Sequence, residues 1–230
     1  NVARMGLLLA GLPVSVPGYT VNRLCASGLT AITSAYLQIV GQESDVVLAG
    51  GVESMSRAPW VTARPIKAFS SPTETADSAL GWRFINPEMA QVDEGNATVS
   101  LGETAERVAE LSGISRQRSD AFAVRSHERA VAAQEQGDFD SEIIPVMTEG
   151  GTVKRDEGPR IDSSPEAMGA LAPVFRSNGI VTAGSASPLS DGAAAVVVAS
   201  RKAVERWGLT PVAVVRGSAS AGVAPSLMGL

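Results

Sequence analysis

The sequence predicts an α/β fold because short apolar runs typical of buried strands alternate with segments of helical periodicity near both ends of the chain. Near the start, residues 21–24 and 45–51 have the strand pattern, and residues 26–40 between them carry apolar side chains at helical spacing. This order predicts a strand–helix–strand unit with a right-handed crossover. A shorter helix, ending near Gly11, is expected before it.

The last third of the chain repeats this order. Residues 193–199 form an apolar run of strand length, and residues 212–219 form another. Between them, Ser200 is placed to cap a helix and Gly208 to end it. We expect both groups of elements to belong to one α/β domain that a long insertion interrupts.

The insertion begins with a segment between residues 55 and 100 in which four prolines break every periodic pattern, so we expect mostly loops and short turns there. Two helices follow, one over residues 102–111 and one that Ser115 caps and Gly137 ends. A strand is expected at residues 143–147. The predicted domains are residues 1–54 and 181–230 for the α/β domain and residues 55–180 for the inserted loop domain.

Composition excludes several classes of protein. The 230 residues are 44% hydrophobic and 19% charged, which is ordinary for a globular protein. A net charge of −5 without a long basic run gives no footprint for nucleic acid, and no apolar stretch is long enough to span a membrane. One cysteine and one histidine exclude an internal disulfide and a Cys/His zinc cluster, so we expect a soluble, cytoplasmic protein without a metal site.

The single cysteine, Cys25, stands where the first predicted strand turns into a helix, in V-N-R-L-C-A-S-G-L. A helix N-terminus presents unpaired N–H groups and a partial positive charge, which favour the nucleophilic thiolate over the thiol. Gly28, in the first turn, lowers helix propensity and suggests that a ligand approaches the backbone closely there. A lone cysteine is also often a small core residue, and the turn by itself leaves both interpretations open.

Two further motifs accompany the one around Cys25. They are G-G-V-E-S-M-S-R-A-P at residues 50–59 and N-G-I-V-T-A-G-S-A-S-P-L-S-D-G-A-A-A at residues 178–195. With these motifs the chain resembles the thiolase family, in its degradative 3-oxoacyl-CoA or β-ketoadipyl-CoA branch. The resemblance implies a thiolase-like α/β fold of two similar halves, with a mixed sheet and an inserted loop domain that covers coenzyme A. It implies that this chain is the first half, cut at both ends, and that the second half is absent.

The resemblance also implies a reaction and the residues that serve it. Cys25 would attack a 3-oxoacyl-CoA, acetyl-CoA would leave, and a second coenzyme A would take the acyl group from sulfur. Coenzyme A would thus be a co-substrate, and no cofactor would stay bound. By the same resemblance Ala183 and Ser187 line the pantetheine channel, Arg160 lies near the nucleotide, and Phe175 offers an apolar face.

The thiolase motifs that carry the catalytic histidine and the second cysteine, G-H-P and C-x-G-G-G, do not occur in the chain. We interpret His127 as part of a solvated, charged helix face and not as the missing base. At full length we expect a homodimer or homotetramer that binds acyl-CoA and CoA. The fragment itself is expected to be inactive and poorly soluble, because it would expose apolar surface.

Other functions remain open at this stage. A non-catalytic acyl-CoA or lipid-binding module of the same fold would explain the absent base without truncation. A β-ketoacyl-synthase-type condensing enzyme shares the fold but generally lacks the T-A-G-S-A-S-P-L-S-D-G pattern. Ser100 and Leu101 stand where many biosynthetic thiolases carry His-Met, which disfavours a short acetoacetyl substrate.

Overall fold

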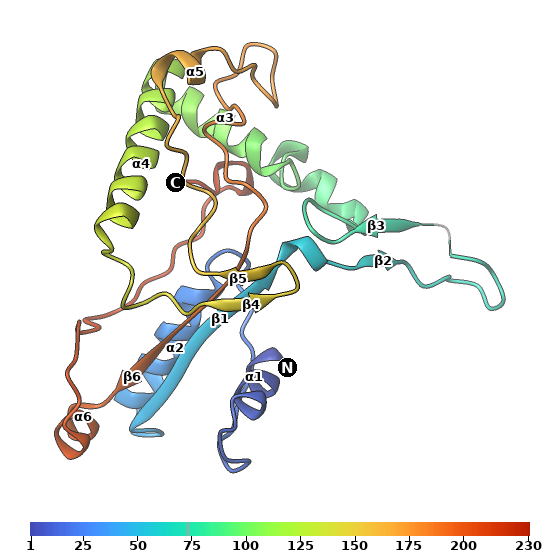
Figure 1. Cartoon of the computed structure of the whole chain (residues 1–230). Coiled ribbons are helices and arrows are strands. Elements are labelled where there is room, and N and C mark those ends of the chain that lie inside the picture. The colour runs from blue at the N-terminus through green and yellow to red at the C-terminus, as the bar shows by residue number, and fades with distance from the viewer. Residues whose placement is uncertain (73) are drawn as a thin grey trace. The chain divides into compact units, whose positions relative to one another are not determined.

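The computed structural model describes residues 1–72 and 74–230. The chain divides by its internal contacts into two compact units (Figure 1). The first unit comprises residues 1–58 and 189–221, and the second comprises residues 59–188 and 222–230. The second unit is therefore inserted between two chain segments of the first.

The first unit is built from helices and two long strands. In chain order its elements are α1 (Val2–Leu9), α2 (Ser27–Val40), β1 (Val46–Ser54), the 3-10 turn η1 (Met55–Arg57), β6 (Asp191–Ala199) and α6 (Arg201–Trp207). The helices predicted at the start of the chain, at residues 26–40 and after Ser200 are confirmed. The Ser200 hydroxyl accepts a hydrogen bond from the Ala203 N–H at 3.1 Å, and Gly208 ends α6 in the left-handed conformation.

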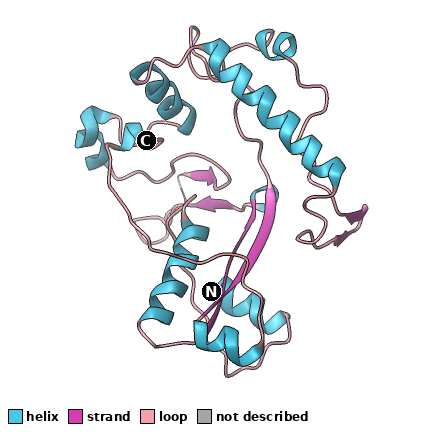
Figure 2. Cartoon of the chain, turned by 90° about the vertical axis from the view of Figure 1, so that its left-hand side faces the viewer, coloured by secondary structure: helices cyan, strands magenta, loops and turns pink. Residues whose placement is uncertain are grey.

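Strands β1 and β6 pair antiparallel along their whole length (Figure 2). In this pairing Leu48 lies opposite Val197. Helix α2 packs on this two-stranded sheet, and Ala49 of β1 and Ala35 of α2 are both buried. Because side chains alternate along a strand, Ala49 and its face meet α2 while Leu48 points to the other side.

The pairing expected for the first strand–helix–strand unit is wrong. Residues 21–24 form no strand and contribute only an isolated bridge between Arg23 and Cys25, and residues 212–219 form no strand either. A strand needs a neighbour for its N–H and C=O groups, and in the described chain β1 is bonded only to β6. The sequence predicts that β1 ends at Gly50 and Gly51, but the ladder to β6 continues through both glycines as far as Ser54.

One face of the β1–β6 sheet is apolar and exposed. The sequence predicts β6 as a buried strand, and the strand forms, but most of its side chains are exposed. Val46, Leu48, Val52 and Val197 share one face by the pairing register and are 41%, 58%, 57% and 62% exposed. We call these four residues the open sheet face.

The second unit contains three helices, two 3-10 segments and two short hairpins among its described residues. They are β2 (Trp60–Thr62) with β3 (Thr75–Asp77), η2 (Pro87–Gly95), α3 (Leu101–Leu111), α4 (Arg116–Gln136), β4 (Val146–Thr148) with β5 (Gly151–Val153), α5 (Pro165–Gly169) and η3 (Pro225–Leu227). The predicted loop character of residues 55–100 and both predicted helices are confirmed. The strand predicted at residues 143–147 begins only at Val146.

Helix α4 begins and ends as its sequence predicts. The Ser115 hydroxyl accepts the Arg118 N–H at 3.2 Å, and Gly137 closes the helix with a φ of 74°. The buried cluster of this unit joins Ala123 and Val124 of α4 to Met168 of α5. Over the described ranges 1–72 and 74–230, the helices are too short or too polar to cross a membrane.

Candidate active site

Cys25 is an exposed, free thiol in the turn that leads into α2. Leu24 before it has a positive φ of 48°, which turns the chain sharply. The Ser27 hydroxyl holds this turn, because it accepts the Arg23 N–H at 2.8 Å and donates to the Leu24 carbonyl at 2.6 Å. The turn is therefore fixed by hydrogen bonds on both sides of the cysteine.

The N-terminus of α2 lies two residues beyond Cys25 and is open to a ligand. Its N-cap residue, Ala26, provides no side-chain hydrogen bond to the first turn. A Cβ added at Gly28 would meet no described atom within 4 Å, so there is free space beside the first turn. A positive helix end next to an exposed thiol is an arrangement that supports a nucleophilic cysteine.

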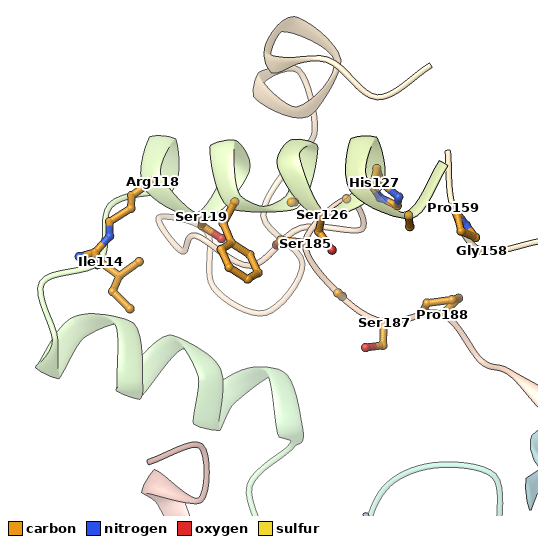
Figure 3. Close-up of a pocket in the computed structure, with 15 residues that line it drawn as sticks. Ile114, Arg118, Ser119, Ser126, His127, Gly158, Pro159, Ser185, Ser187 and Pro188 are labelled. Atoms are coloured by element: carbon orange, nitrogen blue, oxygen red, sulfur yellow. The ribbon is translucent and has the colours of Figure 1, made fainter. Parts of the chain in front are cut away.

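The second unit contains a pocket of about 610 Å³ between one face of α4 and two loop segments (Figure 3). Ile114 and side chains of α4 at helical spacing form one wall, and residues 158–159 and 184–188 form the rest. Figure 3 shows Ser185, Ser187 and Pro188 alongside the α4 face that carries Ser126 and His127. The volume is within the range typical of small-molecule sites, about 300–1,000 Å³.

Of the four residues predicted to contact coenzyme A, the structure places Ser187 in this pocket wall. Ala183 is exposed and lies one residue before the wall begins. The backbone N–H of Arg160 donates to His127 Nδ1 at 3.2 Å, while its guanidinium Nε is 3.4 Å from Asp162 Oδ1. Arg160 thus adjoins the pocket through His127 and also borders a smaller hollow of about 230 Å³.

Phe175 is not one of the described residues that line the pocket. Its ring packs on Gly102 of α3, where an added Cβ would overlap it, and the side chain is still 42% exposed. The ring is therefore packed against α3 along one edge and partly exposed.

The interpretation of His127 as part of a solvated, charged helix face is wrong, while its exclusion as the missing base stays a prediction. It is half-buried, it lines the pocket, and it accepts the Arg160 N–H. Sequence reasoning also missed Ser119 and Ser126, which line the pocket with it. Their spacing of seven residues on one helix is a signal that could have found them, since residues seven apart share a helix face.

The described residues contain no group of three or more His, Cys, Asp or Glu side chains that could hold a metal ion. The side chains at the two locations supply a thiol, hydroxyls, an imidazole and a cationic group.

An exposed thiol beside the N-terminus of a helix and, in the second unit, a pocket of small-molecule size are features of an acyl-transfer protein of the α/β class. Residues 1–202 match the family described as "Thiolase, N-terminal domain". The chain therefore belongs to the thiolase family, and it has the thiolase fold.

Named relatives agree with this family. Over its whole length the chain is 51% identical to a beta-ketoadipyl-CoA thiolase of Pseudomonas aeruginosa and 48% identical to the 3-oxoadipyl-CoA/3-oxo-5,6-dehydrosuberyl-CoA thiolase of Escherichia coli K12. It spans 58% of the length of each. Both relatives are named as thiolases, which are enzymes.

Solved structures of thiolases share the fold. The Bacillus anthracis acetyl-CoA acetyltransferase has a TM-score of 0.86 at 38% identity, and the match covers all of this chain and 57% of that one. Human mitochondrial 3-ketoacyl-CoA thiolase in complex with CoA has a TM-score of 0.78 at 36% identity, covering 91% of this chain and 51% of that one.

Proposed function

We propose that the chain is the nucleophile-bearing part of a thiolase that cleaves a 3-oxoacyl-CoA with coenzyme A, or runs the reverse Claisen condensation. The observation that supports this most directly is the exposed Cys25 thiol at the uncapped N-terminus of α2. The names of the relatives favour a substrate whose acyl chain ends in a free carboxylate, of the β-ketoadipyl-CoA type.

In the proposed reaction the Cys25 thiolate adds to the 3-keto carbon, and the bond between the α and β carbons breaks. The α carbon keeps the electron pair of that bond, takes up the proton that the Cys25 thiol gave up, and leaves as the methyl carbon of acetyl-CoA. The shortened acyl group stays on sulfur as a thioester. The thiol of a second coenzyme A then attacks this thioester, so that Cys25 is released and a new acyl-CoA forms. The Cys25 N–H is a proposed donor to the oxyanion of these steps.

In the proposed reaction some catalytic residues come from this chain and others come from the part of a thiolase that lies beyond its span. The histidine and the second cysteine implied by the family resemblance belong to that part. Coenzyme A is proposed to use the pocket beside α4, with Ser187 on the pantetheine, Arg160 near the phosphates and Phe175 as an apolar contact. Cations near the pocket suit an anionic ligand end.

The test is to trap the acyl group on Cys25 in the protein at its full natural length. Acetyl-CoA should transfer an acetyl group to the peptide that contains Cys25, and iodoacetamide should alkylate the same peptide and abolish thiolysis unless acetoacetyl-CoA protects it. A Cys25→Ser variant with an unchanged circular dichroism spectrum should lose both labelling and activity. Labelling elsewhere with activity kept would sink the assignment, and CoA binding without turnover would favour the non-catalytic module.

A further inference from the structure

Glu106 of α3 is a buried carboxylate that the proposed reaction does not use. It is 4% exposed, and its oxygens accept hydrogen bonds from two consecutive backbone N–H groups. The Ile180 N–H lies 3.0 Å from Oε1 and 2.9 Å from Oε2, and the Val181 N–H lies 2.9 Å from Oε1. A buried carboxylate is costly unless it is hydrogen-bonded, so this contact fixes the side chain and the two amides together.

The chain around this contact is built to allow it. Gly179 has no side chain, and an added Cβ there would overlap the Glu106 carboxylate. Three residues before Gly179, Arg176 pairs with two glutamates of α3. Its Nε lies 3.1 and 3.2 Å from the two carboxylate oxygens of Glu103, and its Nη1 lies 3.2 Å from Glu110 Oε2. Positions 103, 106 and 110 lie on one helix face, where Glu103 and Glu110 bind Arg176 and Glu106 alone binds the amides of residues 180 and 181.

Residues 180 and 181 lead directly into the pocket wall. Thr182 is fully buried, and its carbonyl accepts the N–H groups of Ser185 at 3.1 Å and Ala186 at 3.0 Å. The Thr182 N–H donates in turn to the Ser185 hydroxyl at 3.0 Å. Residues 184–188 follow this tight turn as the wall opposite α4 (Figure 3). The amides that Glu106 holds therefore set where this wall stands.

We propose that Glu106 is a positioning residue for the pocket wall at residues 184–188 and thereby for the ligand that binds against it. In naming coenzyme A as that ligand the inference rests on the proposed function. Glu106 touches no substrate itself and acts through the backbone of residues 180–182.

The test compares Glu106→Gln with Glu110→Gln in the protein at its full natural length. Glutamine keeps the size of Glu106 but turns one acceptor oxygen into an NH₂ group that faces the Ile180 N–H. Amide exchange at residues 180–186 should then be faster by about tenfold, with exchange in α4 unchanged, because a hydrogen bond to a charged group has been lost. Glu110 is one turn further on the same helix with a 75% exposed side chain, and its variant should leave exchange at residues 180–186 as it is.

A second variant approaches the same contact from the other side. Gly179→Ala keeps the carboxylate but displaces it, and it should raise exchange at the same amides. In both variants the Kd for CoA should rise by about tenfold and the KM for CoA with it, while kcat at saturating CoA stays near the wild-type value, since the residue positions the wall and takes no part in the chemistry.

The outcomes separate this inference from the proposed function. Unchanged exchange at residues 180–186 in Glu106→Gln would overturn the positioning role, whatever CoA does. Faster exchange in a protein whose wild type binds no CoA would uphold the role of Glu106 for the wall and refute coenzyme A as its ligand. If Glu106→Gln and Glu110→Gln changed amide exchange equally, Glu106 would contribute only to the general stability of the fold. That result would also overturn the inference.

Discussion

The ring of Phe175 can pack against α3 because residue 102 is a glycine. The ring occupies the space where a Cβ of residue 102 would stand. Gly102→Ala should therefore force the ring or α3 to shift and lower the free energy of unfolding by about 1–3 kcal/mol, the usual cost of overpacking. Urea titration measures this. Gly6→Ala is the control, since a Cβ there meets nothing within 4 Å, and it should stabilise α1 by about 0.5–1 kcal/mol. A loss of the same size in both variants would contradict the close packing.

Arg160 makes a prediction that concerns ligand affinity and not stability. Its side chain is 66% exposed, and its backbone meets His127 of the pocket. If Arg160 contacts the phosphates of coenzyme A, Arg160→Ala should raise the KM for CoA by about tenfold with kcat unchanged. The effect should shrink at high salt, because the side chain is exposed. Steady-state kinetics at two ionic strengths test this, with Arg129→Ala as an exposed control on α4 that should not change the KM.

At the residue scale, sequence could predict what depends on near neighbours. The turn at Cys25, the Ser115 cap and the Gly137 end are decided within a few residues, and each was predictable. The position of His127 was not, because the group that meets it belongs to Arg160, 33 residues further along the chain.

Among the elements, the β1–β6 ladder is closed at one end by Asp191. Its carboxylate accepts the Ser56 N–H at 2.9 Å and the Ser56 hydroxyl, and these hydrogen bonds lower the pKa of Asp191 below 3.8, its ordinary value. When the folded-state pKa of a carboxyl group is lowered, the group contributes its full stabilisation at pH values well above its ordinary pKa. This contribution is lost as the pH falls through the folded-state pKa.

The unfolding free energy should therefore decline as the pH drops below about 4. Asp191→Asn should be less stable than wild type at pH 7, and the difference should narrow toward pH 2. Urea titrations at several pH values measure this. Glu103 and Asp93, whose pKa values are also lowered, remain in both proteins and cancel in the comparison. A difference that does not change with pH would contradict the role of the Asp191 carboxylate.

Helices α4 and α5 are tied together by Arg116. Its Nε is 2.8 Å from the buried carboxylate of Asp120, and its Nη2 donates to the carbonyls of Met168 at 2.6 Å and Leu171 at 2.9 Å. Arg116→Ala would leave a buried carboxylate and two carbonyls without this partner. Since the arginine side chain is 25% exposed, we expect a loss of about 2–3 kcal/mol in the free energy of unfolding, below the full cost of breaking a buried pair.

Chemical denaturation followed by far-ultraviolet circular dichroism measures this loss. Arg129→Ala, an exposed change on the same helix, should stay within about 0.5 kcal/mol of wild type. If the two variants were equally stable, the contacts of Arg116 between α4 and α5 would contribute nothing to the free energy of unfolding.

The strands show why part of the architecture was beyond sequence reasoning. Helices α2, α3, α4 and α6 carry their hydrogen bonds within themselves, so periodicity and caps suffice to predict them. A strand depends on a partner, and the partner of β1 is β6, more than 130 residues away. The apolar patterns at residues 21–24 and 212–219 are strand-like, but in the described chain no strand forms a ladder with either segment.

At the scale of the whole molecule, the decisive feature is the apolar surface that is exposed on the sheet of the first unit, among the described residues. The open sheet face of Val46, Leu48, Val52 and Val197 is flanked in sequence by residues that pack normally, such as the buried Ala49. The chain spans 58% of the length of its thiolase relatives. Exposed contiguous apolar surface favours association, so a chain of these 230 residues alone should self-associate and bind a hydrophobic dye.

Two neighbouring residues on opposite faces of β1 make that prediction specific. Leu48→Lys places a charge on the open sheet face, where it can stay in water, and should lower dye binding and self-association without loss of stability. Val47→Lys places the same charge on the face that α2 covers, where burying it should cost at least about 2 kcal/mol. Sedimentation velocity and dye fluorescence on the 230-residue chain measure association, and urea titration measures stability. A monodisperse wild-type chain that binds no dye, or a Leu48→Lys variant that unfolds as readily as Val47→Lys, would mean that the open sheet face is covered.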